Sequence, residues 1–319
     1  MSTFIQQLIN GVALGAMYAL VGLGYTMVYG VLRMVNFAHG ELVILGPICG
    51  LFILRAMGLI SGPLSGNLAV PLAGITLLSV GLIVLAGAGV FSGMLGVAME
   101  RLAYRPLRRA PVLMPLLSAL GVSVFLQNVT MLASGRAARG FPSFLTVRYF
   151  SVAGATLSSS HIFVVTVCAV LLIVLQYVVQ KTFVGRCFRA VAEDKDTAGL
   201  MGVDVNRTIA LVFALGPFVG AISGVLFAMH YGRVDYSLSS FIGMKGWIAA
   251  VAGGIGSIPG TAAGGLFLGV IEALSAGYLP TLTGGVLGAE YKDIIAFTVL
   301  IVMLILRPQG LFGEAGATI

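Results

Sequence analysis

The sequence predicts an all-α integral membrane protein, a polytopic bundle of about eight or more transmembrane helices with one short or re-entrant segment. Three observations lead to this prediction. The mean hydropathy of the 319 residues is +1.06, and 59% of them are hydrophobic against 9% charged, whereas soluble domains have about 25% charged residues. Apolar runs long enough for a membrane helix recur from end to end. The short alternating segments of a membrane β-barrel are absent from the sequence.

Hydropathy predicts the spans in chain order. They are 8–31, 38–57, 69–99, 112–133, 161–180, 208–230, 260–279 and 290–306, with a shorter apolar piece at 246–256. The 69–99 run exceeds what one bilayer needs, so we expect it to tilt strongly or to extend beyond the membrane. The first span has no basic segment before it and is expected to be retained rather than cleaved as a signal peptide. We expect residues 1–319 to form a single transmembrane domain.

Basic residues predict which side of the membrane each loop faces. Two short loops are rich in Lys and Arg, as cytoplasmic loops are. These residues are Arg101, Arg105, Arg108 and Arg109 in one loop and Lys181, Arg186, Arg189, Lys195 and Arg207 in the other. Alternation then predicts an extracytoplasmic N-terminus, a cytoplasmic C-terminus and seven basic residues outside: Arg55, Arg136, Arg139, Arg148, Arg233, Lys245 and Lys292. It requires the 246–256 piece to cross or re-enter the membrane.

Several function classes lack the residues that they need. The net charge of +7 comes from loops between spans, so nucleic acid is not an expected partner. No GxxxxGK[ST] motif is present, so we expect the chain to bind no nucleotide cofactor and any ATP to be used by other subunits. No HExxH, GxSxG or clustered His/Asp/Glu set is present, so we expect no catalytic residue, no metal site and no enzyme. Cys49, Cys168 and Cys187 are too widely spaced for a metal or disulfide motif and are expected to be packing thiols.

Small residues at four-residue spacing predict close helix packing. The sequence has this spacing in Gly216, Gly220 and Gly224 and in the pairs Gly89/Gly93, Gly260/Gly264 and Gly265/Gly269. Small residues one turn apart let helix backbones approach closely in lipid. The pattern fits either packing within a compact bundle or an interface between subunits.

Two breaks between helices carry candidate functional residues. The VNFAHGE stretch at 35–41 contains Asn36, His39 and Glu41 between the first two spans. Asn36 could cap the second helix while Glu41 favours its positive end; alternatively, the break lines a translocation path or an inner gate.

The GGIGSIPG run at 253–260 predicts the second break. Its glycines, Gly253, Gly254 and Gly256, free the backbone, Pro259 blocks helix continuation, and a new helix is expected to begin near Thr261. This turn is predicted to lie on the cytoplasmic side or at membrane depth, with either a structural or a pathway role. Glu272, in the following span, is a candidate site residue because charges inside spans are costly; a packed, hydrogen-bonded role is the alternative.

The loop at 181–207 is the most highly charged segment, with nine of the 29 charged residues. We expect Asp196 to cap a short helix through Met201, with Gly202 as the left-handed residue after it. Ala190, Ala192 and Ala198 would fit a partner's groove, while Glu193 and Asp194 lie on the polar side. A capped helix held between two spans can pass on a partner's movement as a rigid body. The alternative is a solvated helix at the membrane surface.

Five motifs together resemble the permease subunits of branched-chain amino acid ABC importers, of the LivH type. They are RAVAEDKDTAGLMGVD at 189–204, NFAHGE at 36–41, MERLAYRPLRR at 99–109, GGIGSIPG at 253–260 and LRPQGLFG at 306–313. The resemblance covers nearly the whole chain. It implies a permease domain in the bacterial inner membrane, with residues 190–202 and neighbouring Arg189 as the segment that couples to the ATPases.

The resemblance also implies partners. These are a second, homologous permease of the LivM type, two cytoplasmic ABC ATPases and a periplasmic binding protein that delivers leucine, isoleucine or valine; membrane lipid surrounds the bundle. Related permeases carry urea and short amides, so the solute stays open. Two other classes also stay open, an ATP-independent carrier or channel and a scaffold that transports nothing.

Overall fold

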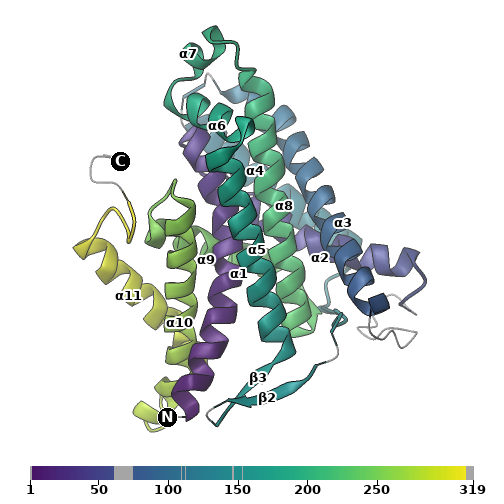
Figure 1. The fold of residues 1–319 in the computed structure, drawn as a ribbon, viewed down its shortest axis with the longest axis vertical. Helices are drawn as coiled ribbons and strands as arrows, with labels where there is room; N and C mark the ends of the chain where they lie inside the picture. The colour runs from purple at the N-terminus through teal and green to yellow at the C-terminus, as the bar shows by residue number, and fades with distance from the viewer. Residues whose placement is uncertain are drawn as a thin grey trace.

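Helices make up most of the described chain (Figure 1). The structure is a computed structural model that describes residues 2–313 apart from 61–74, 109, 112, 146 and 153, so Arg109 and the start of the predicted 69–99 span lie outside the described residues. The helices are α1 (Ser2–Leu32), α2 (His39–Ala56), α3 (Ile75–Met99), α4 (Leu113–Ser134), α5 (Ser159–Lys181), α6 (Phe183–Glu193), α7 (Lys195–Leu200), α8 (Val205–Tyr231), α9 (Leu238–Gly253), α10 (Ile258–Leu282) and α11 (Lys292–Leu306). Three short helical turns are η1 (Glu100–Tyr104), η2 (Arg105–Leu107) and η3 (Ala289–Tyr291).

The number of long spans is close to the prediction. Seven helices within the described ranges are long and apolar enough to cross a membrane: α1, α2, α3 with its continuation to Leu107, α4, α5, α8 and α10. α9 has 16 residues and α11 has 15. At 1.5 Å per residue α9 spans roughly 24 Å, less than the ~30 Å hydrocarbon core. The all-α polytopic prediction is therefore confirmed. Two helices, α9 and α11, are short where one short segment was expected.

One predicted boundary differs from the structure, and one of two alternatives left open by the sequence is decided. The short piece at 246–256 is the second half of α9, which begins at Leu238. The apolar run that was expected to tilt or to extend does extend, because the helix continues past Met99 through η1 and η2 to Leu107. The span Thr76–Leu107 has 32 residues, long enough for roughly 48 Å and more than the hydrocarbon core requires.

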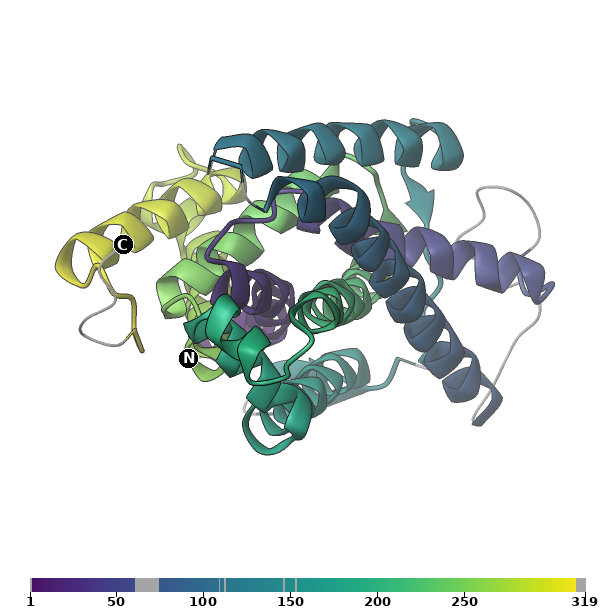
Figure 2. The same ribbon diagram turned by 90° about the horizontal axis from the view of Figure 1, so that it is seen from above.

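α1 and α8 form the centre of the bundle. α1 packs against α10, α8, α9 and α5, and α8 packs against α3 and α2. Both central helices are apolar on all sides, as expected for helices surrounded by other helices. Figure 2, seen along the bundle, shows α4 along one edge and α11 at another, while α2 runs sideways from the centre. Few residues of α4 and α5 are buried.

Glycines allow the central helices to touch backbone to backbone. A Cβ atom on Gly269 of α10 would collide with the backbone of Gly15 in α1, and one on Gly224 of α8 would collide with the carbonyl oxygen of Val43 in α2. These are contacts inside one chain. The four-residue glycine spacing at these positions therefore serves packing within the bundle, the first of the two interpretations.

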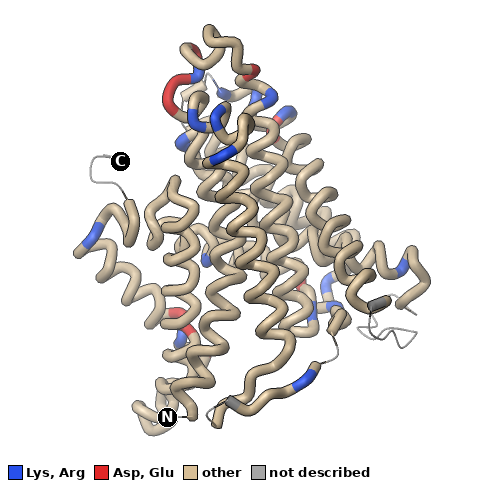
Figure 3. The backbone as a smooth tube through the Cα atoms, viewed as in Figure 1, with Lys and Arg blue, Asp and Glu red and all other residues tan. Residues whose placement is uncertain are grey.

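Segments predicted on one side of the membrane lie together. At one end, here called the α6–α7 end, Arg108 Nη1 donates to Asn206 Oδ1 at 2.8 Å, and most of the charged residues gather there (Figure 3). At the other end, the strand end, the backbone N–H of Thr156 donates to Gln6 Oε1 at 2.8 Å. Two small sheets also lie at the strand end: β2 (Tyr149–Val152) with β3 (Ala155–Ser158), and β1 (Arg139–Gly140) with β4 (Arg233–Val234). The positive-inside rule assigns the α6–α7 end to the cytoplasm.

Candidate functional site

The predicted docking segment folds as two helices. α6 turns its apolar side chains Phe188 and Val191 into the bundle, where it contacts α1, α5 and α8. Its first turn is capped by Thr182, whose hydroxyl accepts a hydrogen bond from the N–H of Gly185 at 3.3 Å. α7 follows after one residue. The sequence analysis predicted only the second helix, although α6 has an amphipathic pattern in which Phe188 and Val191 are buried and Arg186 and Arg189 are exposed.

The cap of α7 is Asp194, so the prediction of Asp196 is wrong by two residues. Asp194 Oδ1 accepts from the N–H groups of Asp196 at 2.8 Å and Thr197 at 3.2 Å, and Oδ2 accepts from Thr197 Oγ1 at 2.7 Å. These bonds, above all the one from the Thr197 hydroxyl, hold the pKa of Asp194 below its usual range. Asp196 lies in the first turn, where its charge favours the helix dipole. Gly202 has φ +85°, which confirms its left-handed conformation.

The outer surface of this element, residues 182–202, differs in part from the prediction. Glu193, Asp194 and Asp196 are exposed, as are Arg189 and Gly202. Ala190 and Ala192 are half-buried, whereas the side chain of Ala198 is buried in its own chain. Ala198 therefore cannot fill a partner's groove, because α7 packs that side chain against the hydrophobic core.

Sequence reasoning missed two apolar side chains at the tip of this element. Leu200 is 88% exposed and Met201 80% exposed. They follow four consecutive charged residues, 193–196, and precede Gly202. The signal that could have identified them is two adjacent apolar residues in a charged loop, directly before the glycine that ends the helix. Exposed apolar side chains with a polar rim are typical of protein interaction sites.

The 33–38 turn places Asn36, His39 and Glu41 in the protein interior, all three buried. Asn36 Oδ1 accepts from the N–H of Ala38 at 3.1 Å and from the hydroxyl of Tyr104 at 2.8 Å. α2 begins at His39 without a side-chain cap, so Asn36 is not the cap that was predicted; it holds the turn before the helix. The side-chain oxygen of Asn36 accepts from the N–H of Ala38, which precedes α2, so it caps no N–H of the first helical turn.

His39 and Glu41 occupy different surroundings. His39 Nε2 lies 3.2 Å from the carbonyl oxygen of Val21, and a side chain at Gly24 or Gly220 would collide with the imidazole. Glu41 lies in the first turn of α2 and accepts from Ser123 Oγ at 3.3 Å. The turn is therefore packed against α1, α8 and α4 rather than open.

The GGIGSIPG turn is covered by the C-terminal segment of the same chain. Gly254 has φ +100° and Gly256 φ +97°, both in the left-handed region that favours glycine. The N–H groups of Leu311 and Phe312 donate to the carbonyl oxygens of Ala252 and Gly253 at 2.9 and 3.0 Å. A Cβ on Gly254 would lie 2.6 Å from the nitrogen of Gly313, which explains why that position is glycine.

The helix after this turn begins earlier than expected. α10 starts at Ile258, three residues before Thr261, because the Ser257 hydroxyl caps it by accepting from the N–H of Gly260 at 3.2 Å. Pro259 lies in the first turn, where its missing N–H costs nothing.

Glu272 is part of a buried ionic cluster. Its Oε2 accepts from Lys245 Nζ at 2.7 Å and from the Tyr18 hydroxyl at 3.0 Å, and its Oε1 accepts from Lys292 Nζ at 2.6 Å. Lys245 also pairs with Asp293 Oδ1 at 2.7 Å. We call Lys245, Glu272, Lys292 and Asp293 the ionic cluster; its two positive and two negative charges balance.

The predicted location of Lys245 is wrong. It was assigned to an extracytoplasmic loop, but it lies inside α9 with a side chain only 1% exposed. Its ammonium also lies 4.2 Å from the ring centre of Phe241, a cation–π contact that stabilises a buried charge. The partners come from three helices, so no local sequence pattern could reveal the cluster.

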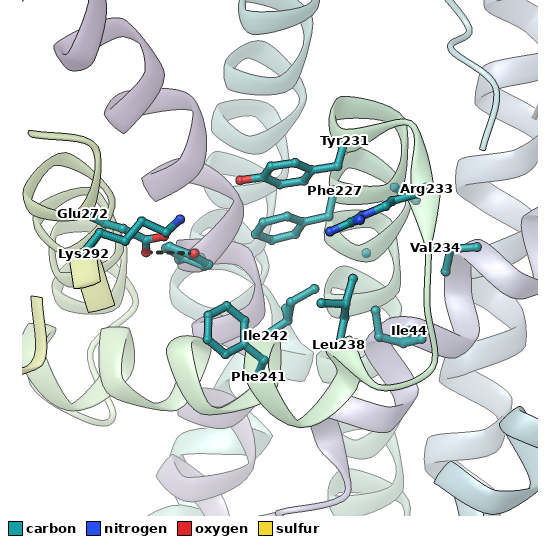
Figure 4. A pocket seen from close by; sticks show the side chains of 13 residues that line it. Ile44, Phe227, Tyr231, Arg233, Val234, Leu238, Phe241, Ile242, Glu272 and Lys292 are labelled. Atoms are coloured by element: carbon teal, nitrogen blue, oxygen red, sulfur yellow. Dashed lines mark hydrogen bonds and ion pairs between the residues drawn. The ribbon is translucent and has the colours of Figure 1, made fainter. Parts of the chain in front are cut away.

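A cavity of about 190 Å³ lies beside the ionic cluster. Figure 4 shows Glu272 and Lys292 on one wall and Arg233 opposite, with Phe227, Phe241 and Ile242 between them. Of the predicted site residues only Glu272 lines this cavity. In the part of the chain that the structure describes, no three His, Cys, Asp or Glu residues are grouped as metal ligands.

The chain is similar to known transport proteins over almost its whole length. Residues 7–304 match the family model described as the branched-chain amino acid transport system permease component. The high-affinity branched-chain amino acid transport system permease protein LivH of Escherichia coli K12 is 41% identical over 98% of this chain and 96% of its own length. BraD of Pseudomonas aeruginosa, described in the same words, is 38% identical over the same shares.

A more distant relative, the autoinducer 2 import system permease LsrC of Enterobacter sp., is 29% identical over 76% of this chain and 65% of its own length. The full-length match and the seven candidate spans agree. The chain belongs to the family of permease components of branched-chain amino acid transport systems.

Proposed function

We propose that this inner-membrane chain is a permease subunit of an ABC importer that translocates leucine, isoleucine or valine, driven by ATP hydrolysis on separate subunits. The observation that carries the proposal is the 41% identity to LivH over 98% of the chain. The chain itself binds no cofactor and catalyses no reaction in this proposal. Its partners are a second permease of the LivM type, two cytoplasmic ATPases and a periplasmic binding protein.

The α6–α7 element is the proposed site of ATPase coupling. Its exposed acidic residues and the apolar pair Leu200 and Met201 form a surface suited to a groove on a partner. Three caps, at Thr182, Asp194 and Asp204, fix the helices one after another between α5 and α8. The ATPases must bind the inward-open and outward-open states with different affinities, since equal binding shifts no equilibrium.

Contacts with the bundle support transmission of that movement. α6 packs on α1, α5 and α8, and α8 runs from α7 to the strand end. Arg108 adds a second link, because it pairs with Glu100 and also donates to Asn206 beside the start of α8. A push on the α6–α7 element would therefore move α8 and η1 together as one body.

The residues of the two breaks are proposed as parts of the translocation path or its gate. They are Asn36, His39, Glu41, Gly253, Gly254 and Gly256, together with Glu272. Interrupted helices buried against neighbours are typical of transporter pathways. The supporting observation is that the first break follows α1 and the second follows α9, and that these two helices pack against each other.

Reconstitution tests the proposal directly. The chain and its partner subunits are placed in proteoliposomes with ATP beside the ATPases and the binding protein on the other face. We expect ATP-dependent uptake of leucine, isoleucine and valine. Uptake of urea or acetamide instead would assign the importer to the amide-carrying relatives. Leucine uptake that follows an ion gradient and persists without the ATPases would establish the carrier or channel, and no flux at all would favour the scaffold.

A further inference from the structure

One cation at the cavity has no counter-charge. Arg233 is in β4, just after α8, and its side chain reaches into the cavity from the wall opposite the ionic cluster (Figure 4). Among the described residues no carboxylate lies within ion-pair distance of its guanidinium. The four charges of the ionic cluster cancel one another, so Arg233 gives the cavity an uncompensated positive charge.

The surface between the two charged walls is apolar. Phe227, Phe241 and Ile242 face the cavity, and the ring of Phe227 stacks on that of Tyr231 with centroids 6.1 Å apart and planes at 7°. Phe241 is further fixed by the ammonium of Lys245 above its ring. The aromatic wall is thus held in place by its own contacts before any ligand enters.

The volume limits the occupant to a small molecule. The cavity volume is about 190 Å³. It is below the roughly 300–1,000 Å³ of pockets that enclose drug-sized ligands. A nucleotide or a peptide is too large, whereas a carboxylate that carries one short branched alkyl chain suits both the volume and the lining.

We infer that this cavity binds an apolar α-amino acid, with its carboxylate on Arg233 and its alkyl chain against Phe227 and Phe241. The inference rests on the proposed function and names a binding site for its substrate within this chain. A guanidinium binds a carboxylate through two parallel hydrogen bonds, which fixes the ligand's orientation. Arg233 and Tyr231 are exposed, so the mouth is open and the ligand's ammonium keeps contact with water.

The position of the cavity suits uptake. Arg233 pairs through its backbone with Gly140, which places the mouth among the sheets of the strand end. The α6–α7 end lies at the opposite end of the bundle (Figure 1). A solute delivered to the extracytoplasmic face would therefore meet Arg233 before it reached the two helix breaks.

Direct binding measurements test this site. The purified permease complex, without the binding protein, is assayed with tritiated leucine by scintillation proximity. We expect saturable binding that Arg233→Gln weakens at least tenfold, since a hydrogen-bonded charge pair is lost. Arg136→Gln is the matched control: it removes an exposed Arg from the same end, away from the cavity, and should leave binding unchanged.

Competition on the unaltered complex tests the orientation without any variant. Leucine and 4-methylpentanoate, which share the carboxylate and the branched chain, should displace the label. Leucinamide and 3-methylbutylamine, which lack the carboxylate, should not. Equal displacement by the amide and the acid would overturn the assignment of the carboxylate to Arg233.

Other outcomes separate this inference from the proposed function. Leucine transport by the complete importer without saturable binding to the permease complex would reject the site and leave the importer intact. Absence of both would reject the proposed function as well. Lipid phosphate that co-purifies with the complex, blocks leucine and disappears in Arg233→Gln would show that a lipid headgroup occupies the cavity, and would also overturn the inference.

Discussion

The two charged regions of the molecule are built in opposite ways. The α6–α7 element collects its charges from one continuous segment and exposes them, and its neighbouring Arg207–Asp204 pair is 87% and 53% exposed. The ionic cluster collects four residues from α9, α10 and α11, and both Lys245 and Glu272 are 1% exposed. An exposed ion pair contributes little to the stability of the fold, whereas a charge buried inside a membrane bundle must be paired. Charge density therefore marks a docking surface, and isolated charges in spans mark an interior network.

The largest expected effect comes from breaking the interior network. Lys245→Met should destabilise the fold by about 3 to 5 kcal/mol, because Glu272 and Asp293 lose the buried cation that they share. Thermal unfolding of the purified complex, followed by the loss of its monodisperse elution, measures this. Lys292→Met is the matched control within the cluster: its side chain is 31% exposed and Glu272 keeps Lys245, so the loss should be smaller. Equal losses in the two variants would show that the burial of the lysine does not determine its contribution to stability.

A large effect on assembly, without an effect on folding, is expected at Leu200 and Met201, the apolar tip of the α6–α7 element. Leu200→Ser together with Met201→Ser should weaken ATPase binding by roughly tenfold or more, because buried apolar anchors dominate interfaces. Titration of the detergent-solubilised permeases with purified ATPase measures the affinity. Leu282→Ser alters a residue that is also 80% exposed, at the end of α10, and should change nothing. Unaltered affinity in the double variant would remove the tip from the interface.

A moderate effect is expected from the cap of α7. Asp194→Ala should reduce coupling severalfold, since three hydrogen bonds that fix the helix are lost. The lowered pKa of Asp194 gives a direction with pH: the cap is fully present above the usual aspartate range and is lost as pH falls through its lower folded-state pKa. Asp194→Asn keeps a capping side chain without the ionisation.

Hydrogen exchange of the α7 amides across pH 2 to 6 tests both variants. Protection factors, which correct for the pH dependence of the intrinsic exchange rate, should fall at acid pH in the natural sequence and stay flat in Asp194→Asn, and they should be low at every pH in Asp194→Ala. A flat response in both the natural sequence and Asp194→Asn would show that the carboxylate charge does not stabilise α7.

The smallest effect is expected at the exposed ion pair. Arg207→Ala removes the partner of Asp204, yet Asp204 still caps α8 through the N–H of residue 207 at 3.0 Å. The melting temperature should not change within experimental error, because exposed pairs contribute little. A loss as large as that of Lys245→Met would contradict the comparison between the two regions.

The sequence predicted the fold and the docking surface better than the interior. The length of the apolar runs was enough to locate the spans, because hydropathy depends only on the local sequence. The left-handed conformation of Gly202 was predictable because glycine adopts a positive φ without steric cost. The cap of α7 was misplaced by two residues because Asp194 and Asp196 could each serve as the cap. The start of α10 was misplaced by three residues because Pro259 was expected to block the helix, whereas it lies in its first turn. Lys245 was misplaced on one side of the membrane, since nothing in its own segment shows that Glu272 and Asp293 lie beside it.

The cavity could not have been predicted from the sequence. Arg233, Phe227 and Phe241 belong to β4, α8 and α9, and only the bend after Tyr231 brings them together. Asn36, His39 and Glu41 were found as a polar group, but the sequence did not show that α1 and α8 enclose them. Side chains that meet through tertiary packing leave no periodic signal along the chain.

The most direct test of ATPase coupling is purification of tagged complexes from native membranes in mild detergent, with and without Glu193→Lys combined with Asp194→Lys. The natural sequence should bring down a second permease-like chain and two ATPase subunits. The double variant should keep the second permease and lose the ATPases, since two exposed acidic residues of the docking surface become basic. Full retention of the ATPases by the double variant, or recovery of this chain alone from the natural sequence across several detergents, would contradict the account.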